Sequence, residues 1–309
     1  MTSGYRLISY RDAAGEAQAG MLVGNRVHAV APLLSDIPNS SSVVGLLKAW
    51  DKVHPRLDAA AAEAKGGTPL PDVKLLAPVL YPGALYCAGA NYWDHLEEMA
   101  EIAKKVTGKA PSMQKAADPY FFMKNTAGAI IGHGTPARLP SFSKQVDWEA
   151  ELGVVIGKQC RHVSEAKAFD VVAGYLIVND LSARDLMKRE GSPFGMDWIG
   201  QKCFEDAAPM GPWFTPAAYI ADPNNLAVKL WVNGILKQNS NTSRLVHGIA
   251  EQIVYLSKHF TLFPGDIIAT GTPAGVGMPR GTFLNAGDEV KIEIDGCGTL
   301  VNRMVADDA

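Results

Sequence analysis

Four acidic residues lie in or beside two apolar segments that can form strands. Asp147, Glu149 and Glu151 alternate in V-D-W-E-A-E-L-G-V-V-I-G, and Asp180 ends the run V-A-G-Y-L-I-V-N-D. In a continuous strand the alternating acids point to one face, and a strand end can reach a site on its neighbour. A buried carboxylate cluster is costly unless positive charge compensates it, which a hard divalent cation does. The pattern predicts Glu149, Glu151 and Asp180 as metal ligands, with Asp147 beside them.

The same alternation has a simpler interpretation, because acids also alternate on the solvated face of an edge strand. Spacing alone leaves the metal site and the solvated edge both open. If a metal is bound, three carboxylates without a histidine or thiol favour Mg²⁺, with Mn²⁺ or Ca²⁺ as alternatives, over zinc.

A second candidate group is the pair His95 and Glu98, three residues apart in a segment expected to be helical from about Asn91. Residues at this spacing share a helix face, so the carboxylate can orient the imidazole as a general base for water. A surface contact is the alternative. The helix is expected because apolar residues recur with helical spacing at Trp93, Leu96, Met99, Ala100 and Ile102.

Two lysines and a threonine complete the candidates. Lys202 lies in a Gly- and Pro-rich segment expected to be an irregular loop, where it either neutralises the charge of an enolate or faces solvent. Lys124 in F-F-M-K-N is a similar case. The glycines around Thr272 in A-T-G-T-P-A-G-V-G allow a ligand to approach the backbone closely, although a tight turn has the same composition.

The composition excludes several classes of protein. The chain has 309 residues, 47% of them apolar, and a net charge of −3 from 29 basic and 32 acidic side chains, so no basic excess favours a nucleic-acid partner. No apolar run approaches bilayer length and the N-terminus does not resemble a secretory signal, so we expect a cytoplasmic protein without membrane association. Four cysteines without C-x-x-C spacing suggest neither a zinc site nor a redox pair.

Turn residues recur between short apolar runs, which favours a strand-rich fold. We expect a small N-terminal α+β domain over residues 1–72, with a turn at Gly24-Asn25 and a helical segment from Ser41 to Lys65. A larger domain over 73–309 is expected to contain a helix from Ser243 to Phe260 and a final strand pair that turns at Asp295-Gly296.

Several of these segments, taken in order, resemble the fumarylacetoacetate hydrolase family, in particular its acylpyruvase and 2-hydroxyhepta-2,4-diene-1,7-dioate isomerase-like branch. The matching pieces span roughly residues 82 to 303 and include G-A-N-Y-W-D-H-L-E-E-M, V-D-W-E-A-E-L-G-V-V-I-G, N-D-L-S-A-R-D, Q-K-C-F-E-D and A-T-G-T-P-A-G-V-G. The segment 99–119 departs from the family's shortest members by its length, and it follows the helix that bears His95.

The resemblance implies an α+β fold with a mixed β-sandwich or β-roll catalytic domain, a divalent cation, and a homodimer. It also implies roles for individual residues. By position in the motifs, the metal ligands are Glu149, Glu151 and Asp180, the catalytic residues are His95, Glu98 and Lys202, and the substrate-binding residues are Thr272, Lys124 and Arg184.

The activity that we expect is hydrolysis of a carbon–carbon bond in an acylpyruvate-like 2,4-dioxo acid, as used in aromatic-compound catabolism. Water activated by His95 and Glu98 attacks the distal carbonyl, while the cation and Lys202 stabilise the departing enolate. Alternatives within the family are decarboxylation of an oxaloacetate-like acid and isomerisation or hydration of a 2-hydroxy-dienoate. A non-catalytic metabolite-binding protein is the alternative from another class.

Overall fold

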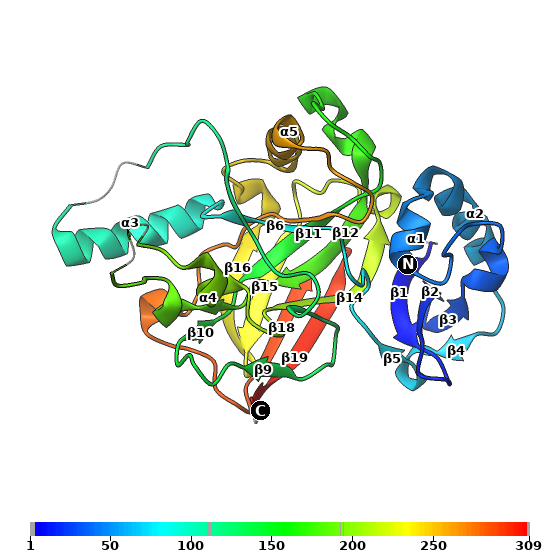
Figure 1. Cartoon of the computed structure of the whole chain (residues 1–309), viewed down its shortest axis with the longest axis horizontal. Coiled ribbons are helices and arrows are strands. Elements are labelled where there is room, and N and C mark those ends of the chain that lie inside the picture. Colours follow the sequence, from blue (N-terminus) through cyan, green and yellow to red (C-terminus); the bar gives the residue numbers. More distant parts are fainter. Residues whose placement is uncertain (1–3, 110–112, 192, 194, 308–309) are drawn as a thin grey trace.

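The computed structural model describes residues 4–109, 113–191, 193 and 195–307. The strands of these residues form three sheets (Figure 1). The largest has twelve strands: β4 (Thr68–Pro69), β3 (Arg26–Ala29), β2 (Ala17–Val23), β1 (Arg6–Arg11), β14 (Ala208–Pro216), β12 (Val172–Asn179), β11 (Ala150–Ile156), β17 (Ile267–Ala269), β6 (Leu85–Gly89) and β7 (Tyr120–Met123) in spatial order, with β5 (Lys74–Leu75) on β1 and β8 (Ile130–Ile131) on β14.

A five-stranded sheet packs beside it in the order β16 (Ile235–Asn241), β15 (Ala227–Val232), β18 (Glu289–Ile294), β19 (Gly298–Ala306) and β9 (Ala137–Leu139). A third sheet pairs β10 (Val146–Asp147) with β13 (Ser182–Ala183). The helices are α1 (Val43–Leu47), α2 (Trp50–Glu63), α3 (Trp93–Thr107), α4 (Trp198–Lys202) and α5 (Ile249–His259). The strand-rich α+β class predicted from the sequence is confirmed.

The strands of the first 72 residues lie at one end of the molecule, with α3 projecting at the other (Figure 1). A two-residue turn joins β2 to β3 at Gly24-Asn25, as predicted, because Val23 pairs with Arg26. Strand β1 continues the large sheet by pairing with β14. The division at residue 72 stays a prediction, since β5, just beyond it, also pairs with β1.

Three expected helices have different limits in the structure. The segment from Ser41 to Lys65 forms two helices rather than one, because Ala49 leaves helical geometry between α1 and α2. The helix expected from Ser243 begins at Ile249, since the backbone at Gly248 is extended. Helix α3 takes up part of the segment 99–119 and ends at Thr107. Gly108 caps it in the left-handed conformation that favours glycine; residues 110–112 lie outside the described part.

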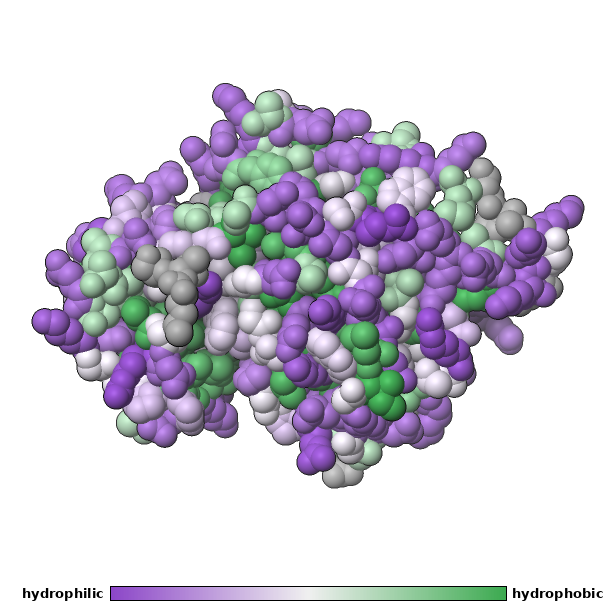
Figure 2. Space-filling view, turned by 180° about the vertical axis from the view of Figure 1, so that it is seen from behind, coloured by the Kyte–Doolittle hydropathy of each residue, from purple (hydrophilic) through white to green (hydrophobic). Residues whose placement is uncertain are grey.

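The interior of the large sheet is apolar. Every residue of β11 and β12 is buried, Glu151 included, which fits strands covered on both faces. The surface of the molecule, seen from behind the view of Figure 1, is mainly hydrophilic, and its hydrophobic side chains lie in small separate groups (Figure 2). Among the described helices, none is long and apolar enough to cross a membrane.

Gln238 on β16 connects the two larger sheets through polar contacts. Its buried side chain accepts a hydrogen bond from the backbone of Ala150 on β11 at 2.9 Å. Its amide nitrogen donates to the Thr272 hydroxyl at 2.9 Å and to the Pro273 carbonyl at 2.8 Å. One side chain therefore fixes the start of β11 relative to the loop that carries Thr272.

We predict that Gln238→Leu lowers the free energy of unfolding by about 3 kcal/mol, because the backbone groups of Ala150 and Pro273 lose their buried partner. Urea denaturation measures this. Gln159→Leu, at an exposed glutamine, is the matched control and is expected to change stability by less than about 0.5 kcal/mol. Equal effects of the two substitutions would show that the connection is unimportant.

Candidate active site

The three predicted metal ligands come together beside the centre of the large sheet. Oxygen atoms of Glu149, Glu151 and Asp180 lie within 4.8 Å of one another. Pairing of β11 with β12 produces this arrangement, because Asp180 follows β12 and donates its backbone N–H to the Glu149 carbonyl at 2.9 Å. The carboxylates are 6%, 1% and 0% exposed, so the solvated-edge interpretation of this segment is wrong.

Two buried lysines contact this cluster. Lys202 Nζ donates to Glu149 Oε2 at 3.1 Å and to Asp180 Oδ2 at 2.7 Å. Lys124 Nζ donates to Asp180 Oδ1 at 2.5 Å and to the Leu181 carbonyl at 2.8 Å. Lys202 is only 3% exposed, so its solvent-facing alternative is wrong. The irregular loop expected there is also wrong, because Lys202 ends the short helix α4.

Glu151 differs from the other two carboxylates because none of the described residues forms an ion pair with it. It accepts one hydrogen bond, from the Gly271 backbone at 2.9 Å. Burial and the neighbouring charges of Asp180 and Glu149 raise the pKa of Glu151 well above its usual range. Burial opposes ionisation of Glu149 as well, but Lys202 and Arg184 outweigh it and lower the pKa of that carboxyl.

The donor set fits a hard divalent cation. Three carboxyl groups supply oxygen ligands at short mutual distance, and none of the described residues provides a cationic partner that would balance an ionised Glu151. A bound divalent cation would supply that balance, because it makes ionisation of the buried carboxyl favourable. The chain therefore has a buried Glu/Glu/Asp metal site.

Arg184 is engaged by the same carboxylates. Its Nε donates to Asp147 Oδ2 at 3.0 Å, and its Nη2 donates to Glu149 Oε1. Asp147 also accepts backbone hydrogen bonds from Gly277 at 2.6 Å and Met278 at 3.0 Å. The alternating acids do not share one continuous strand, since β10 ends at Asp147 and β11 begins three residues later. Asp147 thus lies outside the trio and links Arg184 to the glycine-rich loop.

The His95 and Glu98 pair on α3 faces the interior. His95 Nδ1 lies 3.6 Å from Glu98 Oε2, and both side chains are 14% exposed. Glu98 also pairs with Arg280 at 2.7 Å and accepts a hydrogen bond from Gly275 N–H at 3.2 Å. Burial raises the pKa of Glu98, but the contacts with His95, Gly275 and Arg280 outweigh burial and lower it below its usual value. The surface-contact alternative for this pair is wrong.

Thr272 is held by the protein itself. Its hydroxyl donates to the Ala150 carbonyl at 3.0 Å and accepts from Gln238 at 2.9 Å. A substrate carboxylate that binds this hydroxyl competes with the bond to Ala150. The role of Thr272 in binding a substrate carboxylate stays a prediction.

One cavity, of about 550 Å³, joins most of these residues. His95, Glu149, Arg184, Lys202 and Thr272 line it. The other predicted site residues, Glu98, Lys124, Glu151 and Asp180, lie behind its wall. Sequence reasoning did not assign its other walls, because apolar side chains that line a pocket follow the same helix and strand patterns as those that pack a core. These are chiefly Met99, Ile102, Tyr120, Phe122, Met187, Trp198, Gln201, Val276 and Met278.

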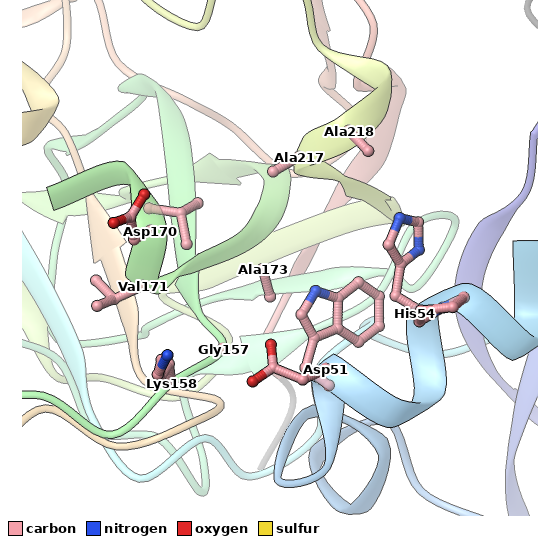
Figure 3. Close-up of a pocket in the computed structure, with 12 residues that line it drawn as sticks. Asp51, His54, Gly157, Lys158, Asp170, Val171, Ala173, Ala217 and Ala218 are labelled. Carbon is pink, nitrogen blue, oxygen red and sulfur yellow. The ribbon is translucent and has the colours of Figure 1, made fainter. Parts of the chain in front are cut away.

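A separate cavity, of about 320 Å³, lies between α2 and the large sheet (Figure 3). His54 and Asp51 reach it from α2, and Lys158 and Asp170 from the other side. The His54 ring stacks on Trp50 with centroids 5.2 Å apart. None of the predicted site residues lines this cavity, and we interpret the His54 contacts as packing between the helix and the sheet.

A buried three-carboxylate site beside a histidine–glutamate pair, on a strand-rich fold, defines a metal-dependent enzyme. A family model described as fumarylacetoacetate (FAA) hydrolase C-terminal matches residues 84–305. The chain belongs to the fumarylacetoacetate hydrolase family, which confirms the resemblance found in the sequence.

The names of this chain's relatives within the family describe different activities. The chain is 40% identical over 237 residues to a mitochondrial oxaloacetate tautomerase of Xenopus laevis, covering 76% of this chain and 69% of that protein. Maleylpyruvate hydrolase from Sphingobium sp. SYK-6, in complex with manganese(II) and pyruvate, is 29% identical with a TM-score of 0.76, covering 97% and 99% of the two chains. A 2-hydroxyhepta-2,4-diene-1,7-dioate isomerase from Mycobacterium marinum is 30% identical with a TM-score of 0.71, covering 99% and 100%.

We predict that Glu149→Gln and Glu151→Gln have different effects on the free energy of unfolding of the metal-free protein. Glu149→Gln leaves Lys202 and Arg184 short of a buried partner and lowers the free energy of unfolding by about 3 kcal/mol. Glu151→Gln removes a carboxylate without a protein cation and keeps an acceptor for Gly271, so stability in EDTA does not fall.

Urea denaturation in EDTA and in Mn²⁺ provides the measurement. Mn²⁺ is expected to stabilise the wild-type chain and to stabilise Glu151→Gln far less. If Glu151→Gln loses as much stability as Glu149→Gln in EDTA, the claim that Glu151 lacks a compensating cation is wrong.

Proposed function

We propose that the chain is a metal-dependent tautomerase of oxaloacetate-type 2-oxo acids, which moves a proton between C3 and the 2-oxo oxygen. The observation that carries the proposal is that one cavity brings His95 together with Glu149 of the carboxylate trio and with Lys202. The oxaloacetate tautomerase relatives support it further, since this chain covers about 70% of their length at about 40% identity.

The chain's own residues supply the proton transfer. When bound, the cation supplies positive charge that stabilises the enolate of a 2-oxo acid. His95 accepts the C3 proton and returns it to oxygen, and the imidazole uses Nε2 because Nδ1 faces Glu98. Glu98 fixes the ring and is itself fixed by Arg280. Lys202 adds a buried cation beside the developing enolate.

A second candidate is the hydrolysis of a carbon–carbon bond in an acylpyruvate-like 2,4-dioxo acid. The His95–Glu98 pair favours it, because a histidine oriented by a carboxylate can also activate water. The maleylpyruvate hydrolase relative supports it as well. Both reactions pass through an enolate next to the 1-carboxylate, and decarboxylation of oxaloacetate shares that enolate too.

We propose Mg²⁺ as the resident cation, with Mn²⁺ or Ca²⁺ as alternatives, because all three prefer oxygen ligands. A small oxo acid is the proposed partner. The homodimer and the cytoplasmic location stay predictions from the sequence, and the Xenopus laevis relative is named as mitochondrial.

We predict that His95→Asn lowers the rate of oxaloacetate enol–keto conversion by about 100-fold or more, the usual contribution of a positioned general base. The absorbance of the enol follows the reaction, and calorimetry checks that Mn²⁺ still binds. The control is His162→Asn, because His162 is exposed and has a φ of 52° that asparagine tolerates.

Assays with and without EDTA, on oxaloacetate and on a panel of acylpyruvates, separate the candidates. Metal-dependent tautomerisation without release of pyruvate from acylpyruvates supports the proposal. If acylpyruvates release pyruvate faster than oxaloacetate tautomerises, hydrolysis of a carbon–carbon bond replaces tautomerisation as the proposed activity. Metal-dependent binding of these acids without any turnover indicates the non-catalytic metabolite-binding alternative.

A further inference from the structure

A buried amide in the wall of the active-site cavity has no assigned role. Gln201 lines the cavity with His95 and Lys202, and it is 2% exposed. Its Oε1 is buried and accepts no hydrogen bond from the residues that the structure describes. An unpartnered amide at such a position carries a free-energy cost, which a ligand that bonds to it removes.

Most other polar side chains of this cavity are already engaged. Lys202 and Arg184 bind the carboxylates, and the Thr272 hydroxyl bonds to Ala150 and Gln238. The Thr107 hydroxyl donates to the Ala103 carbonyl. Gln201 is therefore available to a substrate in a way that these groups are not.

Helix α4 fixes the position of Gln201. Asp197 caps the helix by accepting from Gly200 N–H at 2.9 Å, and Gln201 N–H donates to the Asp197 carbonyl at 3.2 Å. Trp198, one turn earlier, stacks on Phe122 with centroids 5.3 Å apart. Since Lys202 is the next residue, one short helix places a cation at the carboxylate trio and an uncharged amide on the adjoining wall.

We propose that the Gln201 amide binds the oxygen on C4 of the substrate, an inference that rests on the proposed function. An acid held by its 1-carboxylate and 2-oxo group at the metal end extends its C4 group along the cavity. No hydrogen bond among the described residues fixes the Gln201 amide, so rotation about its last side-chain bond brings the NH2 group to the position of Oε1, where it donates to a carboxylate or a ketone oxygen. Gln201 therefore selects 2-oxo acids with a C4 oxygen, namely 4-carboxylates such as oxaloacetate and 2,4-dioxo acids, over those that end in a methyl group.

The test compares two acids that differ at C4. Oxaloacetate has a C4 carboxylate, whereas 2-oxobutyrate has a C4 methyl group, and its enolisation is followed by NMR as exchange of C3 protons with deuterium. Gln201→Leu is expected to lower kcat/KM for oxaloacetate by roughly 10- to 100-fold, the loss of one or two hydrogen bonds to a charged acceptor. Exchange of 2-oxobutyrate is expected to change less than about 2-fold, because no bond to C4 is lost.

Stability separates a binding role from a structural one. Leucine has a similar volume and no hydrogen bond within the described chain is lost, so the Tm of Gln201→Leu is expected to equal or exceed that of the wild-type chain. Gln159→Leu, at an exposed glutamine, is expected to leave both reactions unchanged. Equal losses for both acids, or no loss for oxaloacetate, overturn the inference.

A binding measurement keeps this test separate from the proposed reaction. Calorimetry of Mn²⁺-loaded protein compares 3,3-difluoro-oxaloacetate, which has a C4 carboxylate but cannot enolise, with oxalate, which lacks C4. If Gln201→Leu weakens only the first, the inference stands even when the wild-type chain converts neither acid and the proposed function has failed. If both affinities are unchanged, Gln201 does not bind the C4 group.

Discussion

The repulsion among three buried carboxylates is the constraint on which the rest of the site depends. Like charges at this distance, away from water, are tolerated only with compensating positive charge. Lys124, Lys202 and Arg184 supply part of it from three separate segments, following β7, ending α4 and following β13. The fold must therefore bring distant parts of the chain together around β11 and β12. Because these three cations pair with Glu149 and Asp180 and not with Glu151, the centre is a site for a divalent cation.

The glycine-rich loop after β17 connects the carboxylates to the pair His95 and Glu98. Backbone N–H groups of Gly271, Gly275 and Gly277 donate to Glu151, Glu98 and Asp147 in turn. A side chain at Gly275 would be placed 2.0 Å from a backbone oxygen on β16, and its φ is 105°, so only glycine fits there. One loop thus sets the position of α3 relative to the carboxylates, and the metal chemistry and the base are positioned together.

The sequence predicted the parts of the site that are carried by strongly patterned segments. The alternating acids, the helical spacing of His95 and Glu98 and the order of the motifs were sufficient for them. The break after Asp147 and the short helix that ends at Lys202 were not predicted, because tertiary hydrogen bonds decide both. Arg280, which holds Glu98, and Gln201 could not be found, since a contact across the fold leaves no local pattern in the sequence.

The most direct test of the account is where a divalent cation binds. Crystals grown with Mn²⁺ give an anomalous signal that locates the metal independently of the protein atoms. The account predicts one Mn²⁺ per chain, bound by oxygen atoms of Glu149, Glu151 and Asp180 at roughly 2 Å, with the carboxylate of Glu151 turned toward it. A saturated crystal in which Mn²⁺ lies elsewhere, while the lysines alone contact the carboxylates, would contradict it.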